Sequence, residues 1–300
     1  MGISIKSTGM SVATATTSAI EHSARAARGA MSSAGIEPEQ VGVLINTGVY
    51  RDSNLFEPAI AALIQREAGI GLEYPEGVSR SFSFDLMNGA CGVLNAVQVA
   101  TALLETDSAQ YVLVVSGDTH PSLQRRRPAA DFPFVTAGAA MLLEKTDTPA
   151  GFGPVHVAEL EGTPATRGFA NIAEMGVHGR SLVTVEREDG FEERLLEVAG
   201  VAAGKAIGAH EGGLDLSRTA LISSRPTAGF PAALAAQLGI APEAVLGSGV
   251  VEGDAHTAAL TAAYHQVDEA ILAGYDTVLF VAAGAGPSAA ATVYRLAPTA

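Results

Sequence analysis

The feature that most constrains the fold of this chain is an internal duplication. Six apolar segments occur in one order at residues 24–31, 41–45, 58–70, 90–105, 111–118 and 137–145. Six segments of the same character follow in the same order at 195–209, 219–223, 231–240, 255–271, 277–284 and 288–296. Because six matches in a single order are hard to obtain by chance, the sequence predicts two related halves, residues 1–150 and 151–300.

The apolar patterns predict an α/β fold. Short continuous apolar runs such as 41–45 and 277–281, bounded by Gly, Asp or Ser, are typical of strands buried on both faces. Alanine-rich stretches between them predict helices, so we expect mostly parallel sheets. Residues 90–104 are apolar nearly all round, which predicts a helix in the centre of the molecule. Together these features predict an α-β-α-β-α layered sandwich with pseudo-twofold symmetry.

Two segments fall outside the duplicated pattern. Residues 119–135 form a long, proline-bearing insertion in the first half, and residues 151–190 link the halves through a strand and a loop excursion.

Composition excludes several classes of function. The net charge of −14 and the absence of tryptophan disfavour nucleic-acid binding. One cysteine excludes an internal disulfide and a cysteine metal cluster, and the seven scattered histidines predict no metal site. No apolar run reaches the roughly 18–20 residues of a membrane span, and no signal-peptide core is present, which predicts a soluble, cytoplasmic protein.

The duplication places two chemically reactive side chains at matching positions. Cys91 lies 20 residues before Tyr111, and His256 lies 21 residues before Thr277, the start of the corresponding strand. A pseudo-twofold axis would bring both helix starts toward one central pocket. A helix N-terminus lowers a thiol pKa and can hold an oxyanion, and a nearby histidine can act as acid or base. The alternative for Cys91 is an inert apolar residue in a small-residue helix.

Further candidate residues surround this pair, each with a second interpretation. Asp254 either orients the His256 imidazole or caps the helix. His120, just after a predicted strand, is either a second acid/base or a turn residue. Arg125, Arg126 and Arg127 form the densest basic cluster, which is either a docking patch for an acidic or phosphate-bearing acyl carrier or a solvated loop. Together with Ser224, they are the candidate residues for binding the carrier.

The segment FDLMNGACGVLNAVQVA (84–100), followed by YVLVVSGD, resembles the nucleophile segment of ketoacyl-acyl-carrier-protein (ACP) synthase III enzymes of the thiolase superfamily. The segments 34–48 and 277–296 also resemble that family, so the resemblance covers nearly the whole chain. It implies a five-layered thiolase fold, a homodimer, and transfer of an acyl group from CoA or ACP onto a cysteine, without a permanently bound cofactor. Only Cys91 carries over as a site residue.

The chain departs from the family pattern at three places. Residues 223–226, Ser-Ser-Arg-Pro, occupy the loop where the family has a catalytic histidine, and His256 stands near the position of the catalytic asparagine. Residues 134–136 replace a Gly-Asp-Gly turn. Loss of the histidine–asparagine pair disfavours decarboxylative carbon–carbon bond formation.

The sequence therefore favours an acyltransferase resembling synthase-III-like enzymes of natural-product (secondary) metabolism. Cys91 would be acylated, and His256 would assist transfer to a small-molecule or carrier acceptor. Two alternatives stay open: a non-catalytic partner subunit of an active paralogue, and a decarboxylative ketosynthase III with an unusual set of bases.

Overall fold

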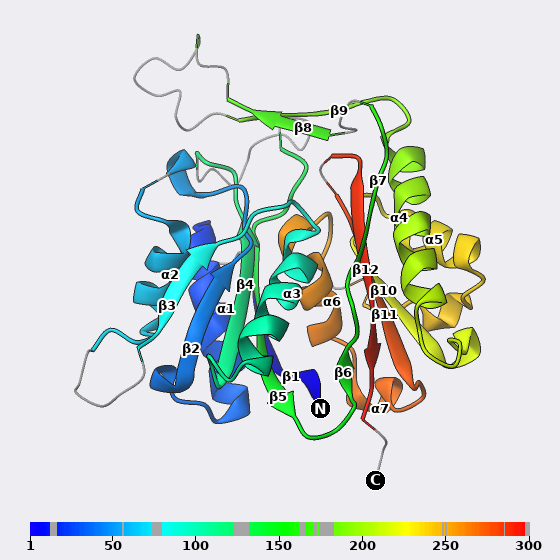
Figure 1. The fold of residues 1–300 in the computed structure, drawn as a ribbon. Coiled ribbons are helices and arrows are strands. Elements are labelled where there is room, and N and C mark those ends of the chain that lie inside the picture. Colours follow the sequence, from blue (N-terminus) through cyan, green and yellow to red (C-terminus); the bar gives the residue numbers. More distant parts are fainter. Residues whose placement is uncertain are drawn as a thin grey trace.

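A computed structural model of the chain shows two sheets separated by central helices and covered by outer helices (Figure 1). The structure describes residues 1–12, 17–55, 57–73, 80–122, 132–162, 166–170, 173, 183–247, 249, 251–284 and 286–297.

The first sheet contains five strands, all from residues 2–146, in the order β1-β5-β4-β2-β3. Strands β2, β3 and β4 are parallel, whereas β5 is antiparallel to both β4 and β1. Their bounds are β1 (Gly2–Val12), β2 (Val41–Asn46), β3 (Phe82–Asp85), β4 (Tyr111–Asp118) and β5 (Ala137–Thr146).

The second sheet has the order β10-β11-β12-β6, and β7 also pairs with β12. Strands β10 and β11 are parallel, and the other pairings are antiparallel. The bounds are β6 (Gly151–Phe152), β7 (His156–Glu159), β10 (Thr219–Ser223), β11 (Thr277–Ala283) and β12 (Ser288–Arg295).

The prediction of mostly parallel sheets is wrong in its detail. Helical crossovers make β2, β3 and β4 parallel, as expected for such connections. No helix separates β4 from β5 or β11 from β12 among the described residues, so each chain returns antiparallel beside the strand it has just left.

The helices complete the predicted α-β-α-β-α layers. Helices α1 and α2 cover the outer face of the first sheet, α3 and α6 lie between the sheets, and α4 and α5 cover the second sheet (Figure 1). The bounds are α1 (Ala19–Ala34), α2 (Ile60–Ala68), α3 (Gly92–Glu105), α4 (Phe191–Gly208), α5 (Phe230–Leu238), α6 (Ala259–His265) and α7 (Glu269–Leu272), with 3-10 turns η1 (Pro38–Gln40), η2 (Asp52–Asn54), η5 (Leu216–Arg218), η6 (Pro242–Ala244) and η7 (His256–Ala258).

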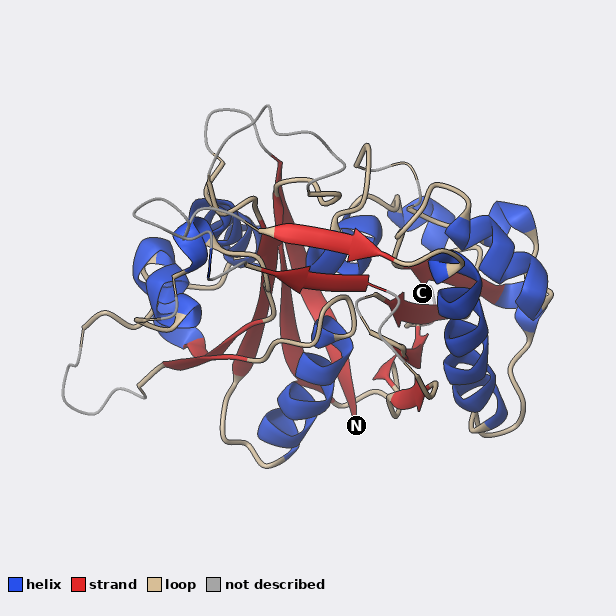
Figure 2. Cartoon of the chain, turned by 90° about the horizontal axis from the view of Figure 1, so that it is seen from above, coloured by secondary structure: helices blue, strands red, loops and turns tan. Residues whose placement is uncertain are grey.

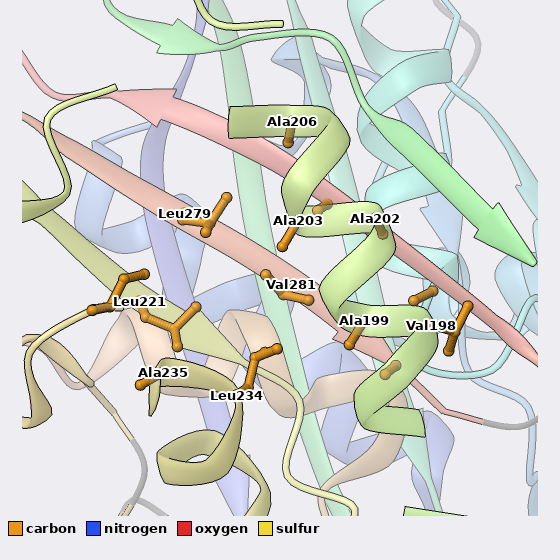
Figure 3. Packing of buried hydrophobic residues seen from close by; sticks show 14 of the residues in the cluster. Val198, Ala199, Ala202, Ala203, Ala206, Leu221, Leu234, Ala235, Leu279 and Val281 are labelled. Atoms are coloured by element: carbon orange, nitrogen blue, oxygen red, sulfur yellow. The ribbon is translucent and has the colours of Figure 1, made fainter. Parts of the chain in front are cut away.

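Alanine-rich faces explain how closely the layers pack. Ala199, Ala202 and Ala206 of α4 face the apolar side chains of the second sheet, as Figure 3 shows. Their short side chains place the helix backbone near the strands, and Leu221 and Leu279 fill the space between. The many alanines of the sequence thus serve the stacking of five layers.

Helix α3 is buried on opposite sides, as its apolar sequence predicts. Val97 and Leu104 pack with the first sheet, whereas Cys91 and Leu94 pack with the second. One helix therefore contributes to two hydrophobic cores.

The halves are also joined directly at a bulge in β1. The register of β1 against β5 shifts between Ile5 and Ser7. The amide of Ile5 donates a hydrogen bond to the hydroxyl of Tyr294, on the last strand of the second half, at 3.1 Å. Tyr294 is 5% exposed, so this contact lies inside the molecule.

An antiparallel pair, β8 (Thr166–Phe169) and β9 (Thr184–Arg187), represents the excursion predicted between the halves. It lies across the end of both sheets, at the top of Figure 1 and in front in Figure 2. Across the described residues, no helix is long and apolar enough to cross a membrane.

Candidate functional site

A tight turn sets the start of α3. The amide of Cys91 donates to the carbonyl of Asn88 at 3.0 Å, and Gly89 has a φ of +50°, which glycine adopts without steric cost. Cys91 is the residue before the first helical position, as the sequence predicts, and its own φ is −74°.

The Cys91 side chain points toward the second sheet. Its Sγ donates to the carbonyl oxygens of Ala282 at 3.6 Å and of Ser288 at 3.8 Å, and the residue is 3% exposed. Burial raises the thiol pKa to about 11. The expectation of a lowered pKa is therefore wrong, because burial outweighs the hydrogen bonds with Ser288 and Ala290 that lower it.

His256 lies in the 3-10 turn η7, directly before α6. Its φ of +47° is unusual for a non-glycine residue, and contacts on several sides fix its ring. The Nδ1 atom lies 3.1 Å from Oδ2 of Asp118. The ring stacks on Phe134 with centroids 4.1 Å apart, and Tyr50 lies 5.6 Å away at a tilt.

Asp118 holds this histidine and was missed in the sequence analysis. Its Oδ1 accepts from the amides of Val49 and Tyr50 at 3.0 and 2.7 Å. Its Oδ2 accepts from His256 Nδ1 and from the amide and hydroxyl of Thr257. Asp118 is fully buried at the end of β4, and an acidic residue ending an apolar strand was the available signal.

The charges of this pair stabilise each other. Burial alone would lower the pKa of His256, but the carboxylates of Asp118 and Asp254 outweigh it and raise that pKa. Burial alone would raise the pKa of Asp118, but the charge and hydrogen bonds of His256 outweigh it and lower that pKa. The two carboxylates therefore favour the protonated form of His256, and its Nε2 is buried without a hydrogen-bond partner.

Asp254 orients the histidine backbone and not its imidazole. Its Oδ1 accepts from the His256 amide at 2.8 Å, and its Oδ2 lies 3.1 Å from Nη2 of Arg187, on β9. Burial is the main cause of its raised pKa. Ala255, and not Asp254, is the N-cap residue of the 3-10 turn η7, so the Asp254 carboxylate instead closes a local turn on the His256 amide.

A narrow recess of about 10 Å³, room for about one water molecule, lies beside His256 and is lined by residues from both halves. Its lining residues are Ala90, Phe134, Thr166, Arg187, Leu195, Pro226, Asp254, His256, Ala283 and Gly284. Cys91 is not among them, although its neighbour Ala90 is.

Sequence spacing explains this result. Ala90 precedes Tyr111 by 21 residues, the same interval that separates His256 from Thr277. The duplication therefore pairs His256 with Ala90, and the one-residue difference at Cys91 turns the thiol toward the second sheet. The expectation that Cys91 and His256 face one pocket is not met.

Neither His120 nor Ser224 is among the residues that line the recess. His120 is buried, with Nδ1 2.5 Å from the hydroxyl of Ser122. The Ser224 hydroxyl donates to the carbonyl of Ala283 and accepts from its amide, so it joins two strands. The candidate docking residues Arg125, Arg126 and Arg127 lie outside the described residues. The described side chains include no group of three or more His, Cys, Asp or Glu arranged to hold a metal ion.

Comparisons with known proteins agree with this architecture. Residues 84–159 match the family model of 3-oxoacyl-[acyl-carrier-protein (ACP)] synthase III. The solved 3-oxoacyl-ACP synthase III of Thermus thermophilus superposes with a TM-score of 0.76 at 20% identity, covering 99% of this chain and 100% of the other. The chain is therefore similar to ketoacyl-ACP synthase III over residues 84–159, and it shares the thiolase fold of the solved synthase III structure.

Two curated relatives of this synthase III-like protein are similar over shorter stretches. An acyl-CoA:acyl-CoA alkyltransferase of Xanthomonas campestris pv. campestris is 34% identical over 95 residues, which are 32% of this chain and 25% of the relative. A beta-ketoacyl-ACP synthase III of Cereibacter sphaeroides is 30% identical over 180 residues, which are 60% of this chain and 46% of the relative. The chain thus spans between a quarter and a half of the curated relatives it matches here. His256, Asp254 and Arg187 lie outside the family-model match.

Proposed function

We propose that this synthase III-like chain binds acyl thioesters of CoA or ACP and transfers the acyl group directly to an acceptor. The observation that carries the proposal is the buried, unpartnered Nε2 of His256 at the recess. An imidazolium fixed by Asp118 is preorganised to donate a hydrogen bond to the thioester carbonyl oxygen and to the oxyanion that forms on attack. The names of the curated relatives, a ketosynthase and an acyl-CoA alkyltransferase, support the substrate class.

The proposed reaction needs no acyl-enzyme. An acceptor amine, alcohol or thiol forms a bond to the acyl carbon while His256 stabilises the oxyanion. The carbon–sulfur bond then breaks, and the departing thiolate of CoA or ACP takes the proton of the acceptor. His256 serves here as a hydrogen-bond donor through Nε2, because its Nδ1 lies against Asp118 and the carboxylates that raise its pKa favour the protonated ring.

An acyl-enzyme at Cys91, which the sequence favours, needs two further changes. The thiol would have to leave the carbonyls of Ala282 and Ser288, and it would have to ionise against a pKa of about 11. The thiolate is the nucleophilic form, so this environment disfavours attack by Cys91.

A second candidate function is a non-catalytic partner subunit. The observation that favours it is the methyl group of Ala90 where the duplication places a side chain opposite His256. In that case the chain would bind a paralogue, whereas the acyltransferase proposal retains the homodimer implied by the resemblance. Native mass measurement, alone and with co-expressed paralogues, separates these two assemblies.

The deciding experiment combines intact-protein mass with thiol release. Wild type, Ala90→Cys, Ala90→Ser and Cys91→Ala are incubated with acyl-CoAs and acyl-ACPs, with and without hydroxylamine as acceptor. We expect wild type and Cys91→Ala to release thiol above background without gaining mass, and Ala90→Cys to gain one acyl group. Ala90→Ser is the matched control of similar size and should gain none.

Other outcomes would redirect the proposal. A wild-type adduct that disappears in Cys91→Ala would establish an acyl-enzyme and overturn direct transfer. Absence of both thiol release and adduct with every donor would overturn the activity and favour the partner subunit.

A further inference from the structure

The described part of the excursion between the halves covers the His256 site. Strands β8 and β9 form a two-stranded sheet of their own, which lies across the end of both main sheets (Figure 2). Thr166 of β8 and Arg187 of β9 line the recess, and His256 itself is only 3% exposed. With room for about one water molecule, the recess admits no acyl thioester while this strand pair stays in place.

Side chains, and not a continuous sheet, hold the strand pair on the rest of the molecule. Val183 and Val185 belong to one buried cluster with the rings of Tyr50, Phe132 and Phe134. Most other residues of the two strands are exposed. A two-stranded sheet is only marginally stable by itself, and a segment with few buried contacts opens at a lower free energy than a core strand. The pair is therefore the part of the covering that separates most readily.

Arg187 supplies polar contacts between the strand pair and the rest of the molecule. Its Nη2 lies 3.1 Å from Oδ2 of Asp254, and its Nη1 donates to the carbonyl of Pro226 at 3.4 Å. The guanidinium carbon lies 5.7 Å from the ring centroid of Phe134, close enough for cation–π attraction. Because Asp254 also accepts from the amide of His256, the ion pair joins β9 directly to the turn that carries the histidine.

Glycines with a positive φ flank the strand pair on both sides. Gly162 has a φ of +110° and Gly190 a φ of +75°, values that glycine adopts without steric cost. Arg194 of α4 contacts both flanks, because its Nη2 donates to the carbonyl of Glu161 at 3.2 Å and its Nη1 lies 3.9 Å from Oε2 of Glu188. Both ends of the excursion are thus held at one helix, an arrangement suited to a hinge.

We propose that β8 and β9 form a lid that turns about Gly162 and Gly190 to admit substrate, and that the ion pair of Arg187 with Asp254 is its latch. The proposal rests on the proposed function in one respect, since it takes His256 as the group that the substrate must reach. Opening breaks the ion pair and lifts the two valines of β9 and its approach from the aromatic cluster. Closing restores both contacts and excludes water from the bound thioester.

Thiol labelling measures this opening without turnover. Ala90→Cys in a Cys91→Ala background places the single thiol of the chain at the recess, where iodoacetamide reaches it only after the lid opens. We expect Arg187→Met and Asp254→Asn each to accelerate labelling about tenfold or more, because each removes one charge of the latch. Since both substitutions break the same interaction, the double variant should be little faster than the faster single variant.

A matched control lies on the lid itself. Arg167 pairs with Glu186 of the neighbouring strand at 3.1 Å, so Arg167→Met should leave the labelling rate unchanged. Native Cys91, buried in the core of the second sheet, reports wider unfolding and should stay slow to label in Arg187→Met. Equal labelling rates in Arg187→Met and Arg167→Met, or a parallel acceleration at Cys91, would overturn the proposal.

Hydrogen exchange followed by mass spectrometry tests the lid with the latch intact. In wild type, we expect the amides of β8 and β9 to exchange well before those of β11 in the second main sheet. Val185→Ala keeps the ion pair and trims only the apolar contact, and it should speed exchange in β9 but not in β11. Exchange of the strand pair as slow as that of β11 would overturn the lid. Absence of thiol release from acyl thioesters, with opening as expected, would count against the proposed function alone.

Discussion

The starts of the two central helices show how far duplicated segments have diverged. Helix α3 begins directly after a tight turn and continues for 14 residues. The corresponding helix α6 has seven residues and is preceded by a 3-10 turn, in which His256 has a φ of +47°. Matching positions therefore present a methyl group at Ala90 and an imidazole held by Asp118 at His256.

Because of this difference, the start of α6 contributes a polar side chain to the recess, whereas the start of α3 contributes only a methyl group. Asp118 comes from the first half, but it serves to hold His256 of the second. At the start of α3, the thiol of Cys91 is buried in the hydrophobic core of the second sheet. A duplicated fold can thus keep its layers while only one copy of a helix start retains a polar role.

The largest effect is expected from removing the charge that holds His256. Asp118→Asn leaves a buried imidazolium without its carboxylate and places amide hydrogens opposite existing donors. We expect a loss of about 3–5 kcal/mol in the free energy of unfolding. Denaturant titration measures it, with Asp276→Asn in the exposed Arg218 pair as the control of little effect. Wild-type stability in Asp118→Asn would contradict this account of the pair.

The next effect tests the close approach of the two halves at the recess. A Cβ added at Gly284 would lie 2.6 Å from the Cβ of Ala90, with backbone atoms of Ala90 also close. Gly284→Ala should cost about 1–3 kcal/mol through overpacking. The double variant Ala90→Gly/Gly284→Ala should recover part of that loss. If the two substitutions instead had additive effects on the free energy of unfolding, Ala90 would not be the residue that clashes with a side chain at position 284.

Stability should depend on pH through the same pair. The raised pKa of His256 contributes stability below its ordinary value of 6.5, and this is lost as pH rises through the folded value. The lowered pKa of Asp118 contributes stability above 3.8, and this is lost as pH falls through the folded value. Each displaced pKa unit corresponds to about 1.4 kcal/mol. Unfolding measured against pH should lose its alkaline decline in His256→Asn, and an unchanged profile would argue against the imidazolium.

The smallest effect is expected at Cys91. Cys91→Ala removes a buried sulfur from the core of the second sheet and should cost about 1 kcal/mol without loss of acyl transfer. Iodoacetamide labelling should be far slower at native Cys91 than at a cysteine introduced at Ala90, because its thiol is buried with a pKa of about 11. Rapid labelling of Cys91 in the folded protein would show that its side chain reaches the recess.

The layers could be predicted from sequence because they depend on periodicity and order. Apolar runs and alanine-rich helices are enough to infer two related halves and a central helix. The site depends on finer detail. Whether Ala90 or Cys91 faces the recess is set by the backbone of the turn before α3, where Gly89 has a positive φ. Spacing counted to within one residue cannot decide this.

Two other site residues were hidden for different reasons. Asp118 is visible as an acidic end to an apolar strand, but its partner lies 138 residues away and is brought near only by the packing of the halves. Arg187 belongs to the excursion between the halves, so the duplication offers no counterpart from which to infer its role. The repeated sequence pattern therefore does not reveal site residues that long-range packing or an unrepeated insertion brings to the recess.

The bond between Ile5 and Tyr294 has a consequence for the history of the molecule. The bulge in β1 frees an amide, and the last strand of the other half supplies the hydroxyl that satisfies it. A symmetric protein assembled from two copies of either half would contain the donor without the acceptor, or the acceptor without the donor. The ancestral copies have become complementary, and neither half is now a replacement for the other.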